Sequence, residues 1–179
     1  MSRFDALLLQ RALQALGKPA PVAAQLPQAD RPTAVEIAAA LCRRFEGFYS
    51  RPYLCPAGVP TIGYGATHYL DGVRVTLKDA PISRETAERL LLAQIERTYL
   101  PAVLRLCPAM ITEPAERMAA IIDFTFNLGD GRLRSSTLRK RINAGEWEQV
   151  PAELRKWTIG GGKVLRGLVL RREAEIALV

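Results

Sequence analysis

The sequence lacks the features that mark several common protein classes. No apolar run approaches the ~20 residues that a membrane-spanning helix requires. The chain has one His and three Cys, and no two Cys form a Cys-x-x-Cys pair, which argues against a zinc-finger framework. Aromatic residues make up only 7%, so an aromatic-rich binder of single-stranded nucleic acid is not expected. Because the Cys count is odd, at least one thiol is free or pairs between molecules.

The composition is that of an ordinary globular chain with an excess of positive charge. The 179 residues correspond to one domain with a short extension, and 49% of them are apolar. Lys and Arg number 25 against 18 Asp and Glu, a net charge of +7, and 11 of the 25 but only 5 of the 18 lie in residues 132–179. This balance favours nucleic acid, anionic lipid or an acidic cell-wall polymer as partner. No nucleic-acid-binding signature accompanies the charge, so nucleic acid is not predicted as a partner.

Residues 1–32 differ in pattern from the rest of the chain. Apolar residues recur near helical spacing up to Leu16. Gln10 and Arg11 interrupt this run, so it favours an amphipathic helix over a secretory signal peptide. Residues 18–32 carry four prolines among Ala and Gln, which is typical of an extended linker.

The main domain is predicted over residues 33–179. Thr33 and Glu36 form a capping-box pattern before an apolar run that ends near Gly47, which predicts the first helix. Turn signals such as Asp71-Gly72 then predict a small antiparallel sheet of two or three strands, at 53–55, 61–65 and 73–75. Helices are expected near 84–106, 113–127, 136–144, 146–157 and 163–177, with breaks at Pro101, Pro108, Gly129–Gly131, Gly145 and Gly160–Gly162. The predicted fold class is therefore α+β, mainly α.

Glu46 is the first candidate for chemistry. It ends the first helix between Phe45 and Phe48, where the helix dipole disfavours negative charge and apolar neighbours reduce solvation. Both effects favour the uncharged acid that general acid catalysis needs. From the local sequence alone, a solvated glutamate at a helix end explains the residue equally well.

Cys55 and Thr61 follow in the predicted sheet. A Cys near a strand is most often a small buried apolar residue, and a Thr in a strand often reflects β-propensity. A hairpin folded back on the helix end would nevertheless bring both residues to one cleft with Glu46.

Together these three residues resemble the Glu-x8-(Asp/Cys)-x5-Thr pattern of phage lysozymes in glycoside hydrolase family 24. The resemblance covers roughly residues 33–179, and its several ordered motifs make it more specific than a single short pattern. The segments that carry it are Phe45-Glu46-Gly47, Pro52-Tyr53, Thr61-Ile62-Gly63-Tyr64-Gly65, Asp123 to Gly129, Ser136-Thr137-Leu138 and Gly167 to Glu175.

The resemblance implies a lysozyme-like fold with a small β-hairpin lobe and a larger helical lobe. It implies an endolysin that hydrolyses the β-1,4 bond between N-acetylmuramic acid and N-acetylglucosamine in peptidoglycan, with inversion and without a cofactor or metal. Glu46 would be the general acid, while Cys55 and Thr61 would hold a water on the opposite face of the sugar. The role of Cys55 stays open between base, nucleophile and water-positioning group.

Departures from the family pattern and further positions follow from the same resemblance. Many members carry Asp where this chain has Cys55, and His68 is interpreted as a hairpin or cleft-rim residue. An Arg of the C-terminal helix, Arg171 or Arg172, is expected to approach Glu46. Some members hold the catalytic Cys in a disulfide, so a Cys42–Cys55 bond is an alternative to the expectation that Cys42 and Cys107 lie in the core.

Two other functions stay open at this point, a lytic transglycosylase and a non-catalytic peptidoglycan-binding protein on a lysozyme scaffold. The protein is expected to be a monomer that accumulates in the host cytoplasm and acts on peptidoglycan in the periplasm. A holin would permit its export. The basic C-terminal helices would contact the acidic wall or anionic outer-membrane lipid, unless they are merely a solvated face.

Overall fold

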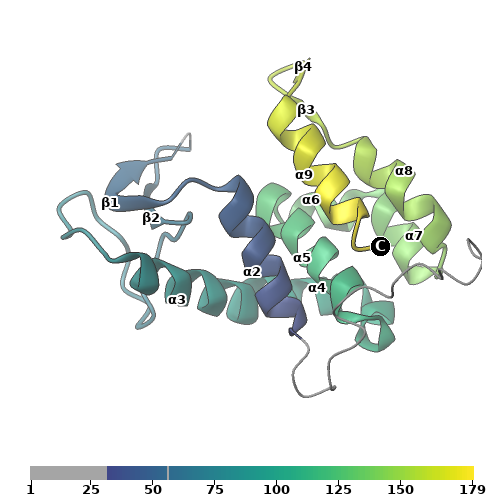
Figure 1. The fold of residues 1–179 in the computed structure, drawn as a ribbon, viewed down its shortest axis with the longest axis horizontal. Coiled ribbons are helices and arrows are strands. Elements are labelled where there is room, and N and C mark those ends of the chain that lie inside the picture. Colours follow the sequence, from purple (N-terminus) through teal and green to yellow (C-terminus); the bar gives the residue numbers. More distant parts are fainter. Residues whose placement is uncertain (1–31, 56) are drawn as a thin grey trace, which may run out of the picture. The chain divides into compact units, whose positions relative to one another are not determined.

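The computed structural model of the protein describes residues 32–55 and 57–179 (Figure 1). The helix and linker predicted for residues 1–32 lie outside the described residues, apart from Pro32, and stay predictions. The helices are α2 (Ala34–Phe45), α3 (Arg84–Gln94), the π-helical η3 (Ile95–Tyr99), α4 (Leu100–Leu106), the 3₁₀-helical η4 (Pro108–Thr112), α5 (Ala115–Leu128), α6 (Asp130–Ser135), α7 (Thr137–Asn143), the 3₁₀-helical η5 (Trp147–Gln149), α8 (Val150–Arg155) and α9 (Arg166–Ile176). The strands are β1 (Tyr49–Leu54), β2 (Pro60–Gly63), β3 (Ile159–Gly160) and β4 (Lys163–Val164).

Helix α2 begins and ends where the sequence predicts. The Thr33 backbone N–H donates to Glu36 Oε2 at 2.8 Å, and the Glu36 N–H donates to Thr33 Oγ1 at 3.3 Å, so both halves of the capping box form. Ala38, Ala39 and Cys42 form the buried face of the helix. The helix therefore delivers the residue that follows Phe45 to a defined position.

Strands β1 and β2 form the small antiparallel sheet that the turn signals predict. Tyr53 pairs with Thr61 in this sheet. The third predicted strand, 73–75, is absent from the described chain, because beyond Gly63 the pairing shrinks to isolated bridges such as His68 with Arg74. The Asp71-Gly72 turn itself forms, since the Tyr69 N–H donates to the Val73 carbonyl oxygen at 2.9 Å.

The segment 84–106 is helical throughout, and the break predicted at Pro101 does not occur. The five-residue π-helix η3 separates α3 from α4, and Pro101 falls in the first turn of α4. A first-turn position needs no intrahelical N–H donor, so proline is tolerated there. The change of hydrogen-bond register in η3 explains why the proline does not end the helical segment.

Helix α5 lies at the centre of the helical lobe, with α2 and α9 packed against it (Figure 1). The continuous run Met118–Thr125 is buried, as expected for a helix covered on all sides. The glycines at 129 and 131 were predicted as a break, and Gly129 does end α5 with φ +85°, but α6 begins directly after it. The periodicity of the sequence therefore did not predict α6, because Gly129 and Gly131 were interpreted as a break.

The C-terminal region departs from the prediction in its details. The helix predicted over 146–157 consists of η5 followed by α8, and residues 163–164 belong to a β3–β4 hairpin before α9 begins. The α+β, mainly α prediction is confirmed, with a small hairpin lobe and a larger helical lobe. Across the described ranges, none of the helices has both the length and the apolar character needed to cross a bilayer.

Candidate active site

Glu46 is the C-cap residue of α2, and its backbone N–H donates to the Cys42 carbonyl oxygen at 2.8 Å. Its side chain is 34% exposed and therefore accessible from solvent. Arg171 in α9 donates from Nη1 to Glu46 Oε1 at 2.6 Å. The carboxyl is thus ion-paired, a contact that the local sequence argument did not include. Of the two arginines expected near Glu46, Arg171 is the one in contact.

Arg171 is itself held from behind by Asp123 of α5. Arg171 Nε donates to Asp123 Oδ2 at 2.8 Å, and Nη2 donates to Oδ1 at 2.9 Å, a bidentate pair with side chains 3% and 0% exposed. Burial opposes the charge of Arg171, but its contacts with Asp123 and Glu46 outweigh burial and raise its pKa. The guanidinium is therefore a fixed cation.

Cys42 completes this cluster from α2. Its Sγ donates to Asp123 Oδ1 at 3.3 Å. Burial, and then the nearby Asp123 carboxylate, raise the Cys42 pKa far above its ordinary value, so the sulfur stays a protonated donor. Cys42 is buried, as predicted, and so is Cys107. The Cys42–Cys55 disulfide alternative is wrong, because the cysteines at 42, 55 and 107 are all free.

Cys55 and Thr61 come together on the hairpin. Cys55 follows β1 directly, and Thr61 in β2 is buried. The backbone N–H groups of Val59 and Ala57 stabilise the thiolate and lower the Cys55 pKa. Thr61 Oγ1 donates to the Val59 carbonyl oxygen at 2.9 Å. Since the hydroxyl proton is committed to that bond, the Thr61 oxygen can accept a further hydrogen bond.

Tyr53 relates this hairpin to Glu46. Burial raises the Tyr53 pKa, and the charges of Tyr49, Glu46 and Cys55 raise it further. Glu46 and Cys55 are therefore both close enough to Tyr53 to act on it electrostatically. Tyr49 stacks on Tyr53 with ring centroids 4.3 Å apart and is 49% exposed, so an aromatic surface lies beside the candidate site.

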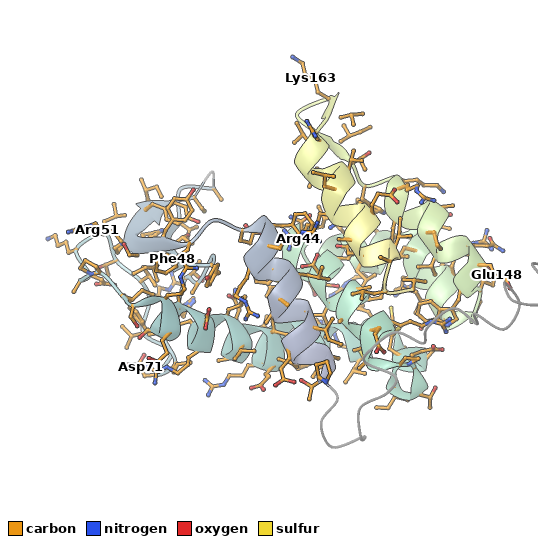
Figure 2. All side chains as sticks on the ribbon, in the orientation of Figure 1. Arg44, Phe48, Arg51, Asp71, Glu148 and Lys163 are labelled. Atoms are coloured by element: carbon orange, nitrogen blue, oxygen red, sulfur yellow. The ribbon has the colours of Figure 1, made fainter. Side chains whose placement is uncertain are left out.

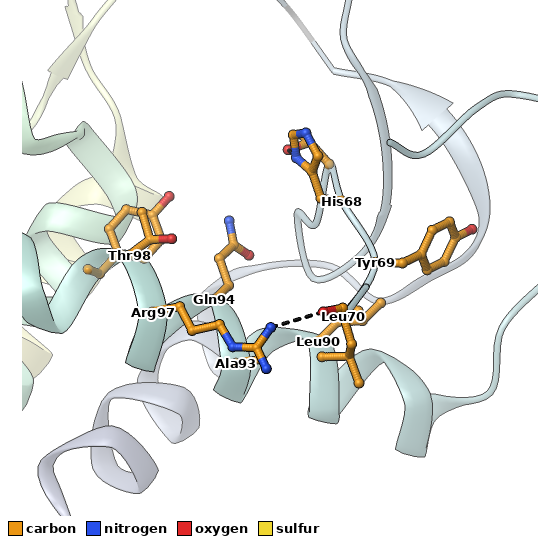
Figure 3. A pocket seen from close by; sticks show the side chains of 10 residues that line it. His68, Tyr69, Leu70, Leu90, Ala93, Gln94, Arg97 and Thr98 are labelled. Carbon is orange, nitrogen blue, oxygen red and sulfur yellow. Dashed lines mark hydrogen bonds between the residues drawn. The ribbon is translucent and has the colours of Figure 1, made fainter. Parts of the chain in front are cut away.

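A groove runs along the long helical segment 84–106. A cavity of about 390 Å³ is lined by His68 and Leu70 from the sheet lobe and by Arg97 and Tyr99 from η3, and Arg97 Nη1 donates to the Leu70 carbonyl oxygen at 2.9 Å (Figure 3). A second cavity of about 500 Å³ shares Arg97 and Tyr99 with the first. The interpretation of His68 as a cleft-rim residue agrees with this position.

Tyr99 joins the groove to the Glu46 cluster. Its ring packs on Phe126 at 5.1 Å between centroids, and the Arg171 guanidinium lies 5.8 Å from the Phe126 ring. Burial raises the Tyr99 pKa, and the charges of Cys42 and Glu46 contribute. In the part of the chain that the structure describes, no cluster of His, Cys, Asp and Glu has the composition of a metal site.

Two features of the site were missed by the sequence reasoning. Asp123 was noted only as part of a motif, although an acid inside the apolar run 118–125 requires a buried partner and could have been singled out. The basic surface was also overestimated, because Arg171 and Arg172 are buried. Only folding places these two arginines inside rather than on a solvated face.

Comparison with known proteins shows the family of the chain. The family model described as phage lysozyme matches residues 43–175. The endolysin of Bacillus phage B103 is 37% identical over 143 residues, 77% of this chain, and this chain spans about half (50%) of that relative's length. The endolysin of Acyrthosiphon pisum secondary endosymbiont phage 1 is 35% identical over 144 residues, covering 77% of this chain and 91% of the relative.

A solved structure shares the fold as well. The endolysin from Escherichia coli O157:H7 phage FAHEc1 superposes with a TM-score of 0.67 and 30% identity, covering 79% of this chain and 89% of that one. The chain therefore belongs to the phage lysozyme family, and it is a lysozyme-type hydrolase. The predictions of a lysozyme-like fold and of a glycoside hydrolase are confirmed.

Proposed function

We propose that this protein is an endolysin that hydrolyses the β-1,4 bond between N-acetylmuramic acid and N-acetylglucosamine in peptidoglycan, with inversion at the anomeric carbon. One observation carries the proposal. The partly exposed Glu46 carboxyl, ion-paired to the buried Arg171, lies near a hairpin on which the Cys55 thiol and the Thr61 hydroxyl meet. An acid and a water-holding pair are what a one-step inverting hydrolysis needs.

In this mechanism Glu46 gives its proton to the departing glycosidic oxygen as the bond to the anomeric carbon breaks. A water on the opposite face of the ring forms the new bond to that carbon. Thr61 accepts a hydrogen bond from this water, since its own proton is already donated to Val59. An inverting site needs its two reacting groups ~6.5–9.5 Å apart, which leaves room for the water.

Cys55 takes the proton that the water releases. A free thiol has a pKa of ~8.5 and is mostly protonated at neutral pH. The backbone N–H groups of Val59 and Ala57 lower the Cys55 pKa and so increase its thiolate fraction. This favours a base over a merely space-filling residue.

The test is the release of reducing sugar ends from purified peptidoglycan by the wild type and by Glu46→Gln. A general acid contributes about 10²–10⁴-fold, so the variant should lose that much activity while its circular dichroism spectrum and melting temperature stay near those of the wild type. Glu148→Gln is the matched control, because Glu148 is an exposed glutamate of η5 that Figure 2 shows at the opposite end from Phe48. Equal activity of Glu46→Gln and Glu148→Gln would refute the assignment.

The products separate the alternatives. Hydrolysis yields reducing N-acetylmuramic acid ends, and proton NMR of fresh product shows the inverted anomer. Anhydro-muramic ends identify a lytic transglycosylase instead. Binding to peptidoglycan without release of any sugar end by the wild type identifies a non-catalytic binding protein.

The cellular context completes the proposal, and it rests on the sequence. We infer that the monomeric protein accumulates in the host cytoplasm and reaches peptidoglycan in the periplasm once a holin has permeabilised the inner membrane. Contact with anionic outer-membrane lipid would use the cations that stay exposed, such as Arg132, Lys140 and Lys163. Arg171 and Arg172 do not contribute to it, because both are buried.

A further inference from the structure

Arg171 lies between two acids of different exposure. Asp123, 0% exposed, binds one edge of the guanidinium through Nε and Nη2, while the partly exposed Glu46 binds the remaining Nη1. The Cys42 thiol donates to the same Asp123 carboxylate. Three N–H and S–H donors therefore surround the Asp123 carboxylate.

This arrangement answers a difficulty of the proposed mechanism. A lone buried cation touching a carboxylate favours the charged carboxylate, and so opposes the proton that a general acid must carry. Asp123 supplies one negative charge at hydrogen-bond distance from that cation. The pair has no net charge, so Glu46 experiences a dipole and a hydrogen bond rather than a full positive charge.

Glu46 is also faced by groups from other elements. Cys42 lies on α2, Tyr53 comes from the hairpin and Tyr99 comes from η3, and the Glu46 charge acts on all three. The pKa values of Cys42, Tyr53 and Tyr99 are raised, in each case first by burial, so these three groups are neutral near pH 7. On α9, Arg172 and Glu175 lie close enough to Asp123 for its charge to act on both. Asp123 is thus the described acid that directly balances Arg171.

We propose that Asp123 is a positioning residue for Glu46: it fixes the Arg171 guanidinium so that one N–H meets the Glu46 carboxyl, and it cancels the cationic charge that would otherwise strip Glu46 of its proton. This inference rests on the proposed function for its catalytic meaning. The effect of Asp123 on the protonation of Glu46 is measurable without substrate.

The experiment compares the pH dependence of kcat/KM in the wild type and in Asp123→Asn. With the compensating charge removed, Arg171 acts on Glu46 as a net cation, and the alkaline limb of the profile should move to lower pH by about one to two units. Arg171→Gln leaves Asp123 as the net charge and should move that limb to higher pH. The double variant should return it toward the wild-type position. A rate loss with an unmoved limb in all three variants would overturn the proposal, because a structural role lowers activity without this pattern.

The matched control is Glu173→Gln. Glu173 lies on the same helix and pairs with Arg155 at 2.8 Å, but both side chains are about half exposed, so solvent screens the change and the limb should stay in place. A limb that moves as far in Glu173→Gln as in Asp123→Asn would mean that net charge alone is responsible, which would also overturn the proposal.

The titration of the Glu46 side-chain carboxyl by carbon NMR gives a second readout that needs no turnover. If the wild type hydrolyses nothing, the proposed function fails while the titration still tests the role of Asp123. Should Asp123→Asn fail to fold, the double variant, which leaves neither ion unpaired, is compared with Arg171→Gln. These two proteins differ only at Asp123, and an identical titration of Glu46 in both would refute the proposal.

Discussion

Removing the acid of the buried Arg172–Glu175 pair offers the sharpest test of how α9 is held in the core. Arg172 Nη2 donates to Glu175 Oε1 at 2.5 Å, and both side chains are 0% exposed. Arg172 also donates to Asn127 Oδ1 at 3.2 Å, and its guanidinium lies 5.2 Å from the Phe124 ring centroid. The change Glu175→Met keeps the volume and the helix propensity but leaves this guanidinium without its anion.

Breaking one partner of a buried pair costs about 3–5 kcal/mol, because the remaining charge is neither paired nor hydrated. For a chain of this length about 1 kcal/mol corresponds to ~2–4 °C, so the melting temperature should fall by about 6–20 °C. The double variant Arg172→Met/Glu175→Met removes both charges and should recover most of the loss. Glu173→Gln, which breaks the exposed pair with Arg155, should cost at most ~1 kcal/mol.

Calorimetry or thermal denaturation followed by circular dichroism measures all four proteins. A melting temperature of Glu175→Met within ~2 °C of the wild type would refute the predicted loss, because ~3–5 kcal/mol corresponds to a fall of about 6–20 °C. The prediction also fails if the double variant is no more stable than the single one.

Two further predictions concern the hairpin. Iodoacetamide should modify Cys55 before the other cysteines, and the modification rate of Cys55 should rise at a lower pH than that of Cys107, whose pKa burial raises to about 11. Mass spectrometry at a series of pH values measures the modification of each cysteine. Equal modification at all three sites would contradict the lowered pKa of Cys55. Tyr49→Ala should raise KM for peptidoglycan fragments about 5–30-fold with little change in kcat, because an aromatic face against a ligand is worth ~1–2 kcal/mol. Val73→Ala, which changes an exposed apolar residue of the same lobe outside the lining of the groove, is the control, and a similar KM effect there would remove Tyr49 from the binding surface.

The sequence predicted the fold class because its strongest signals are local. The Thr33/Glu36 capping box and the Asp71-Gly72 turn act over three or four residues, and both form as expected. The third strand was predicted from the same local logic and fails, because a strand needs a partner edge that the residues after Gly63 do not provide. The continuous helix through Pro101 depends on the π-helical register of η3, which no residue pattern revealed.

The candidate site likewise contains residues that local sequence patterns reveal and residues that only long-range contacts bring together. Glu46, Cys55 and Thr61 lie within a short stretch, so their spacing was visible, and their catalytic roles stay predictions. Asp123 and Cys42 became part of the site only through contacts between distant segments, which periodicity does not show. The approach of Arg171 came from family resemblance rather than from the chain's own pattern.

The Glu46–Arg171 contact joins residues 125 positions apart, from the first and the last helices of the described chain (Figure 1). During synthesis the ribosome has already released the hairpin and the groove long before α9 emerges. Until that helix docks, the carboxyl has no guanidinium beside it and Asp123 has no cation to hold. A nascent or truncated chain without α9 therefore lacks the guanidinium that pairs with Glu46 and Asp123 in the complete fold.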